Sequence, residues 1–122
     1  MKNNMLSIRP FIGTKDFKIS KSFYADLGFE AIELSNDLCL LKMNTVHFYL
    51  QNAYVKDWVD NTMVFIEVEN VEKFYRNLLD LKLTSKYDAV KIVPIRALAW
   101  GKECFVHDPS GILWHFGEFK KY

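Results

Sequence analysis

The stretch Leu98–Phe119, LAWGKECFVHDPSGILWHFGEF, indicates a strand, a tight turn and a second strand. Residues 99–107 are rich in aromatic and β-branched side chains, which favour an extended strand. Asp108-Pro109-Ser110-Gly111 fits a type I turn, with an acceptor side chain first, proline second and glycine last. The mostly apolar return strand, 112–119, contains His115, which makes this histidine the first candidate for a functional residue.

Length and composition restrict the possible classes of protein. The chain has 122 residues, enough for one domain with a core of its own, residues 1–122, but not for two. Half of the residues are hydrophobic and 25% are charged, as in globular proteins. The net charge of +1 gives no electrostatic reason to expect nucleic acid or a membrane surface as partner. No apolar run approaches the ~18 residues of a membrane span.

The two cysteines and the N-terminus indicate the compartment. Cys39 and Cys104 are far apart in the sequence and belong to no CxxC motif, so we expect two buried, reduced thiols. The first residues, MKNNMLS, are polar and lack the apolar middle of a signal peptide. Both observations favour a cytoplasmic protein.

Hydrophobic periodicity predicts two helices, each with an N-cap residue. Asp16 caps a first helix that ends at Gly28, and Asn70 caps a second one. The expected apolar stripes are Ile19, Phe23 and Leu27 in the first helix and Val71, Phe74, Leu78 and Leu81 in the second. The expected strands are 5–12, 29–34, 38–43, 46–51, 62–69, 90–95, 98–106 and 112–119, with a polar crossing at 52–61 and a weak pattern at 82–88.

This order is βαβββ followed by βαβββ, over modules of approximately 5–52 and 61–122. A short echo supports duplication, because a Phe-Ile pair precedes a Phe-Tyr pair in each half. The fold class is therefore α+β, with two βαβββ modules forming a curved mixed sheet around a concave cleft. If the helices cover the purely apolar side of each strand, the other side faces the cleft. That side carries Arg9, His47, Tyr49, Met63, Phe65, Glu67 and His115.

At this point the chain resembles the vicinal oxygen chelate superfamily, which includes glyoxalases, ring-cleaving dioxygenases and bleomycin-resistance proteins. The resemblance is to the bleomycin-resistance proteins and covers nearly the whole chain. Four ordered segments carry it: SIRPFIGTKD, SFYADLGF, DNTMVFIEVENVEKFY and AWGKECFVHDPSGILWHF. It implies a protein that binds and sequesters a small molecule, possessing no metal or other cofactor, and a role in antibiotic resistance.

The alternative is a metal-dependent enzyme like a glyoxalase or dioxygenase, with a degenerate site at His47 and His115. The superfamily's metal positions map here onto Arg9, His47, Met63 and His115. A guanidinium cation and a thioether are poor ligands for a hard divalent metal, so at most two acceptable ligands remain. We therefore expect no metal catalysis. The resemblance also involves a cationic drug bound by an acidic protein, whereas this chain is near neutral and places Arg9 and His47 toward the cleft.

The remaining residues keep two or three interpretations each. His115 is a polar residue satisfied by a neighbour such as His47 or Tyr49, a contact to an aromatic-containing ligand, or a metal ligand. Trp100 is core packing or a stacking wall of the site. Arg9 and Glu67 pair across the cleft or hold a charged group of the ligand.

The resemblance further implies a homodimer that exchanges an N-terminal arm hinged at a proline, matched here by Pro10. The alternative for Pro10 is a proline on an edge strand.

Overall fold

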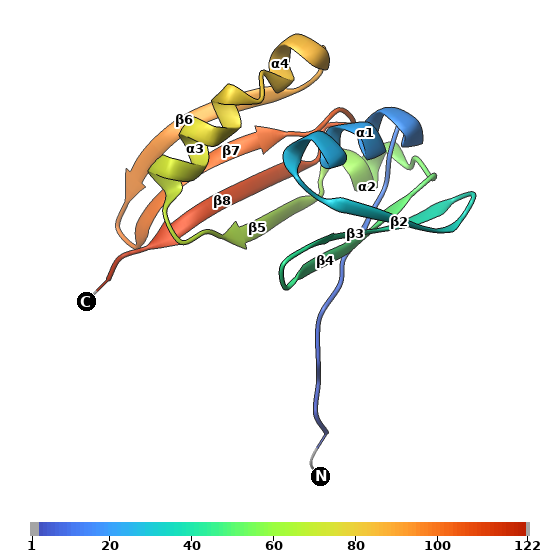
Figure 1. Cartoon of the computed structure of the whole chain (residues 1–122), viewed down its shortest axis with the longest axis horizontal. Helices are drawn as coiled ribbons and strands as arrows, with labels where there is room; N and C mark the ends of the chain where they lie inside the picture. Colours follow the sequence, from blue (N-terminus) through green and yellow to red (C-terminus); the bar gives the residue numbers. More distant parts are fainter. Residues whose placement is uncertain (1–2, 122) are drawn as a thin grey trace.

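The computed structural model describes residues 3–121 and contains two four-stranded sheets. In the first sheet the strand order is β1-β4-β3-β2, and in the second it is β5-β8-β7-β6. In each sheet the first strand of the module pairs parallel with the last, and the other neighbours are antiparallel. Each sheet has a helix on one side, as Figure 1 shows for α3 above β6–β8. The α+β class and the paired βαβββ modules are therefore confirmed.

The first module consists of β1 (Phe11–Ile12), α1 (Phe17–Leu27), β2 (Glu30–Ser35), β3 (Leu38–Met43) and β4 (Val46–Gln51). Both predicted ends of α1 are confirmed. The Asp16 side chain accepts a hydrogen bond from the Ile19 amide at 3.1 Å, and Gly28 ends the helix in the left-handed region at φ 118°. The predicted apolar stripe is wrong at Ile19, which is 46% exposed, because Ser20 and Tyr24 occupy the buried face instead.

The second module consists of β5 (Met63–Glu67), α3 (Val71–Asp80), α4 (Leu83–Lys86), β6 (Lys91–Leu98), β7 (Gly101–His107) and β8 (Leu113–Phe119). The predicted cap is again confirmed, since the Asn70 side chain accepts from the Lys73 amide at 3.0 Å. The segment with a weak pattern contains the single-turn helix α4. The chain turns at Ala99–Trp100, so the predicted strand 98–106 begins three residues later, at Gly101.

Two other expectations about elements are wrong. The polar crossing between the modules contains a short helix, α2 (Lys56–Asp60). The first strand is much shorter than the expected 5–12, because only Phe11 and Ile12 pair with β4. Residues 3–10 are exposed and run away from both sheets (Figure 1).

A buried hydrogen-bond network joins the two modules. The Tyr24 hydroxyl of α1 donates to Asp108 Oδ2 at 2.6 Å and accepts from Trp114 Nε1 on β8 at 2.8 Å. Asp108 Oδ1 accepts from the Ser110 and Ile112 amides, at 2.8 and 2.9 Å. Burial raises the pKa of Tyr24 well above its ordinary value, and the neighbouring Asp108 carboxylate adds to the shift. The predicted DPSG turn thus also fastens the first helix to the last strand.

The described residues contain one continuous core and two buried thiols. Aromatic rings from both modules meet in it, including Phe48 of β4 and Trp114 of β8, whose centroids are 5.0 Å apart. Cys39 and Cys104 are buried and free, as the sequence predicts. Within residues 3–121, no helix is both long and apolar enough to cross a membrane.

Candidate functional site

An aromatic patch, made of Phe65, Trp100 and Phe119, lies on the side of the second sheet that faces away from α3. Its ring centroids are 5.2 to 5.7 Å apart. Gly117 forms the floor of the patch, since a Cβ there would lie 2.6 Å from the Phe65 ring and 3.1 Å from that of Trp100. Phe65 and Phe119 are 42% and 47% exposed, and Met63 beside them is 65% exposed. This surface is large, apolar and open to a partner.

A polar cluster, made of His115, Glu103 and Arg96, lies on the same side of the sheet. His115 is directly opposite Phe65 on β5 and Phe105 on β7. Its Nδ1 is 2.8 Å from Glu103 Oε1, and the Glu103 residue is only 5% exposed. The ring packs edge-on against Phe105, with centroids 4.6 Å apart. The other ring nitrogen, Nε2, is buried and has no hydrogen-bond partner among the described residues.

A β-bulge brings Arg96 to this cluster. In the β6–β7 ladder Val93 pairs with Phe105, and regular pairing would then place Ile95 opposite Glu103. The ladder shifts between Val93 and Arg96, so that Arg96 stands opposite Glu103 instead. Pro94 lies within the shift, where the missing N–H costs no ladder bond on an edge strand.

The bulge gives the guanidinium two contacts. Arg96 Nη2 is 3.7 Å from Glu103 Oε2, and its Cζ is 4.9 Å from the centre of the Phe105 ring. The side chain of Arg96 is nevertheless 58% exposed. A distance of 3.7 Å is too long for a good hydrogen bond, so most of the guanidinium donors face solvent.

The corresponding side of the first sheet carries a second cluster. The Arg9 guanidinium donates to the Tyr49 hydroxyl at 3.1 Å and lies over the Tyr49 ring at 5.9 Å. Phe11 stacks on the same ring, with centroids 4.7 Å apart. Arg9 thus pairs with Tyr49, where the sequence suggested Glu67.

A groove of about 640 Å³ lies between β4 of the first sheet and the edge strand β5 of the second. Its size is within the range of small-molecule sites. Val46, Phe48, Val64, Ile66 and Trp114 give it an apolar floor. Ile8 and Pro10, from the segment that leads into β1, lie at its edge.

The sequence-predicted site residues divide among these places. His47, Phe65 and Glu67 line the groove. Arg9 and Tyr49 form the cluster on the first sheet, while Met63, Trp100 and His115 lie on the second sheet. No hydrogen bond or aromatic contact joins the two clusters within residues 3–121. The one concave face expected from strand alternation is thus split between two sheets in a single chain.

The partner of His115 differs from the expected one. The sequence suggested His47 or Tyr49, but the histidine is held by Glu103, which is on the neighbouring strand of its own module. His47 instead places its Nδ1 3.1 Å from the Thr45 carbonyl oxygen. Sequence reasoning overlooked Glu103, Arg96 and Phe105. Pro94 within a predicted strand was the one signal for the bulge that assembles them.

The residues at the superfamily's metal positions do not fit a metal ion. Arg9 is a permanent cation engaged with Tyr49, and Met63 offers a thioether on an exposed strand. Residues 3–121 contain no group of three or more His, Cys, Asp or Glu side chains placed to hold a metal. Structural and catalytic metal sites usually have three or four protein ligands.

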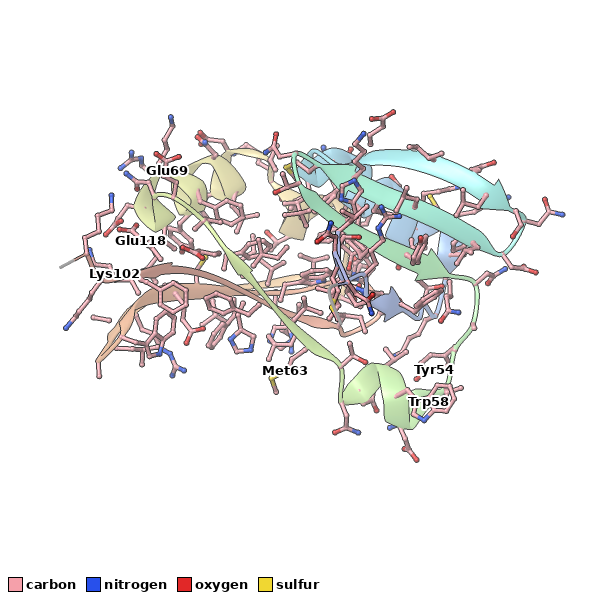
Figure 2. All side chains as sticks on the ribbon, turned by 90° about the horizontal axis from the view of Figure 1, so that it is seen from below. Tyr54, Trp58, Met63, Glu69, Lys102 and Glu118 are labelled. Carbon is pink, nitrogen blue, oxygen red and sulfur yellow. The ribbon has the colours of Figure 1, made fainter. Side chains whose placement is uncertain are left out.

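A second exposed aromatic surface lies near the edge of the second sheet. Figure 2 shows Trp58 on the short helix α2 and Tyr54 just before it, on the same side of the molecule as Met63. Trp58 is 73% exposed and Tyr54 43%. Trp58 shares a small hollow with Phe11 of β1, and Lys15 Nζ lies 5.6 Å from the centre of the Tyr54 ring.

Comparisons with known proteins identify the fold. No family model and no curated protein sequence matches the chain. Several solved structures, in contrast, match it over nearly its whole length. The bleomycin-binding protein of Streptomyces verticillus, complexed with copper(II)-bleomycin, has a TM-score of 0.81 and 20% identity over 98% of this chain and 100% of its own. An antibiotic-binding protein from Streptomyces sp. CB03234 has a TM-score of 0.75 and 12% identity over 98% and 100%. A lactoylglutathione lyase from Agrobacterium tumefaciens has a TM-score of 0.70 and 14% identity over 95% and 96%.

At such low identities the likeness concerns the arrangement of the chain, and both binding proteins and an enzyme share it. It covers both modules in full, in agreement with the four sequence segments that carry the resemblance. The chain therefore has the fold that these bleomycin-binding, antibiotic-binding and lactoylglutathione lyase structures share.

Proposed function

We propose that this protein, as one domain over residues 1–122, binds and sequesters a small, aromatic-containing molecule without metal catalysis. The aromatic patch is the observation that carries the proposal. Its exposed rings adjoin the groove between the modules, because Phe65 belongs to both. An apolar, aromatic wall with a few polar groups is the usual composition of a small-molecule site. Bleomycin-binding and antibiotic-binding proteins of the same fold support the class of ligand.

The ligand-contacting residues in this proposal come from both modules. From the first module they are Arg9, His47 and Tyr49. From the second they are Met63, Phe65, Glu67, Trp100 and His115. His47, Phe65 and Glu67 share one groove, whereas the clusters of Tyr49 and His115 have no direct contact, so we expect a second copy of the chain to complete the site.

The N-terminal segment supports a homodimer with exchanged arms. Met5, Leu6 and Ile8 are 91 to 94% exposed on a segment whose N-terminal part leads away from the two sheets in Figure 1. Large apolar side chains in a row favour burial against a partner, by roughly 1.5–3 kcal/mol for each Leu or Ile. Pro10 is the hinge in this proposal, and the edge of the partner's groove is where the arm lies.

Sedimentation velocity tests the arm. We expect the full chain to be a dimer and Ile8→Asp to weaken the dimer at least about tenfold, because the aspartate cannot enter an apolar interface. Leu79→Asp is the matched control, since Leu79 is 46% exposed on α3, away from the arm. A full chain that sediments as a monomer, or an equal effect of both variants, would contradict the exchanged arm.

Titration with metal-free bleomycin and with simple aromatic probes tests the binding function. We expect tryptophan fluorescence to change, because Trp100 is part of the aromatic patch, and calorimetry to detect heat. Phe65→Ala should weaken binding, and Leu79→Ala should not. Saturable binding of an aromatic probe but not of bleomycin would retain the class of function and exclude this antibiotic.

A role in antibiotic resistance requires drug protection of cells that express the protein. The cytoplasmic location, proposed from the two free thiols, is tested by cell fractionation.

A further inference from the structure

We infer that His115 selects, among aromatic ligands, those that carry an O–H or N–H donor, through a lone pair on Nε2 that Glu103 fixes in place. This inference rests on the proposed function and specifies the chemistry of its ligand. His115 Nε2 is the one buried side-chain nitrogen or oxygen that lacks a hydrogen-bond partner among the described residues. A buried polar atom without a partner costs about 1–3 kcal/mol, so a ligand that satisfies it gains affinity.

The geometry determines which kind of partner Nε2 requires. A carboxylate only accepts hydrogen bonds, and Glu103 Oε1 is 2.8 Å from His115 Nδ1. When the ring carries a single proton, this contact places the proton on Nδ1 and leaves Nε2 as an acceptor. The nearby Arg96 guanidinium keeps the carboxylate paired on its other oxygen, at 3.7 Å. Glu103 is thus a positioning residue for the imidazole.

The surroundings of Nε2 favour a planar aromatic ligand. Phe65 is directly opposite His115 on β5, which is the unpaired edge of its sheet, and its ring is 42% exposed. The Phe65 ring lies over Gly117, two residues along β8 from His115, and its movement breaks no sheet hydrogen bond. Arg96, spread over Phe105 and mostly exposed, lies on the same side of the sheet and offers donors to an oxygen of the ligand. A hydroxyl on an aromatic ring meets both requirements, as donor to Nε2 and as acceptor from the guanidinium.

Two coumarins that differ in one group test the inference. The phenol of 7-hydroxycoumarin can donate, whereas the methoxy group of 7-methoxycoumarin cannot. We expect the wild-type protein, treated with EDTA, to bind the hydroxyl compound about tenfold more tightly, which corresponds to about 1.4 kcal/mol. Ring ¹⁵N shifts of His115 in the free protein should show a proton on Nδ1.

The variants separate the acceptor from mere structure. His115→Gln can donate its amide to Glu103 and keep a carbonyl oxygen as acceptor, so it should retain the preference. The double variant His115→Phe with Glu103→Gln removes the acceptor without leaving a buried charge unpaired. Its affinities for 7-hydroxycoumarin and 7-methoxycoumarin should therefore have a ratio of about one. Circular dichroism of the double variant checks that the protein is still folded.

The outcomes distinguish this inference from the proposed function. Equal binding of the two coumarins, or a proton on Nε2, overturns the inference and leaves the proposed aromatic site in place. A preference that appears only when a divalent metal is added also overturns it, in favour of metal ligation by His115. Binding of neither coumarin contradicts the inference and the aromatic site together.

Discussion

Removal of the Tyr24 hydroxyl should destabilise the protein strongly, because one oxygen atom connects the two modules. In Tyr24→Phe, Trp114 Nε1 loses its acceptor and Asp108 Oδ2 loses its donor, with all three residues at most 3% exposed. Each group left unpaired in a buried place costs about 1–3 kcal/mol. Asp108 Oδ1 keeps its two amide donors, so we expect a total near 3 kcal/mol. That is a large part of the ~6–18 kcal/mol typical of a chain of this length.

Urea unfolding followed by circular dichroism measures this change. We expect a lower midpoint with an unchanged slope, since the surface exposed on unfolding stays the same. Tyr75→Phe is the matched control, because Tyr75 is only half-buried and its hydroxyl makes no hydrogen bond within the described structure. A loss below about 0.5 kcal/mol in Tyr24→Phe, the usual range of surface substitutions, would refute the role of the network.

Three further predictions concern alkaline pH and two glycines. Burial raises the pKa of the Cys104 thiol from 9.0 to about 11, so the unfolded chain loses this proton at a lower pH than the folded protein. The free energy of unfolding should therefore fall as pH rises from 9 to 11, by up to about 1.4 kcal/mol per pH unit. Urea midpoints of the wild type and of Cys104→Ala across this window check the prediction, and an equal fall in both proteins would count against it. The raised pKa of Tyr24 acts in the same direction above pH ~10, so Cys104→Ala should reduce the fall without abolishing it. Gly117→Ala should cost less than about 1.5 kcal/mol but weaken coumarin binding several-fold, because the new methyl displaces the exposed ring of Phe65 and presses on that of Trp100. Unchanged binding in calorimetry would argue against the patch as the ligand wall. Gly101→Ala should lower the free energy of unfolding by about 3 kcal/mol or more, because its methyl would collide with a backbone carbonyl of β8 that the strand holds in place. A variant that unfolds at the same temperature as the wild type would contradict this prediction.

Local features of the fold were predictable because they depend on residues close in sequence. Asp16 and Asn70 cap helices through bonds that span three residues, and Asp108 forms its turn through bonds that span two to four. Such signals are complete in the sequence itself. The network around Tyr24 is different, because its partners lie 84 and 90 residues away. Helical periodicity alone predicted Ile19 on the buried face. In the structure Tyr24 lies there instead, because its hydroxyl bonds to the Asp108 carboxylate and the Trp114 indole.

The candidate site was predictable by face but not by partner. Alternation along single strands correctly separated the helix-covered side, with Phe48 and Trp114, from the side with His115 and Phe65. It could not give the relative position of the two sheets, so residues of both modules were expected to share one face. Alternation also could not predict the change of strand register at a bulge. One extra residue at Pro94 decides that Arg96, and not Ile95, stands opposite Glu103.

The separation of the two faces has a thermodynamic consequence for the proposed function. In one chain the clusters of Tyr49 and His115 have no direct contact, so in the proposed dimer we expect the wall of one copy to face the wall of the other. A ligand held by both walls binds the dimer more tightly than the monomer, and linkage then requires that the ligand strengthen the dimer by the same factor. The exposed arm acts on the same equilibrium, because burying Leu6 and Ile8 against a partner favours the state in which the walls meet. In the proposed dimer, ligand binding and arm exchange are therefore two contributions to one association, although the residues that carry them are in different parts of the chain.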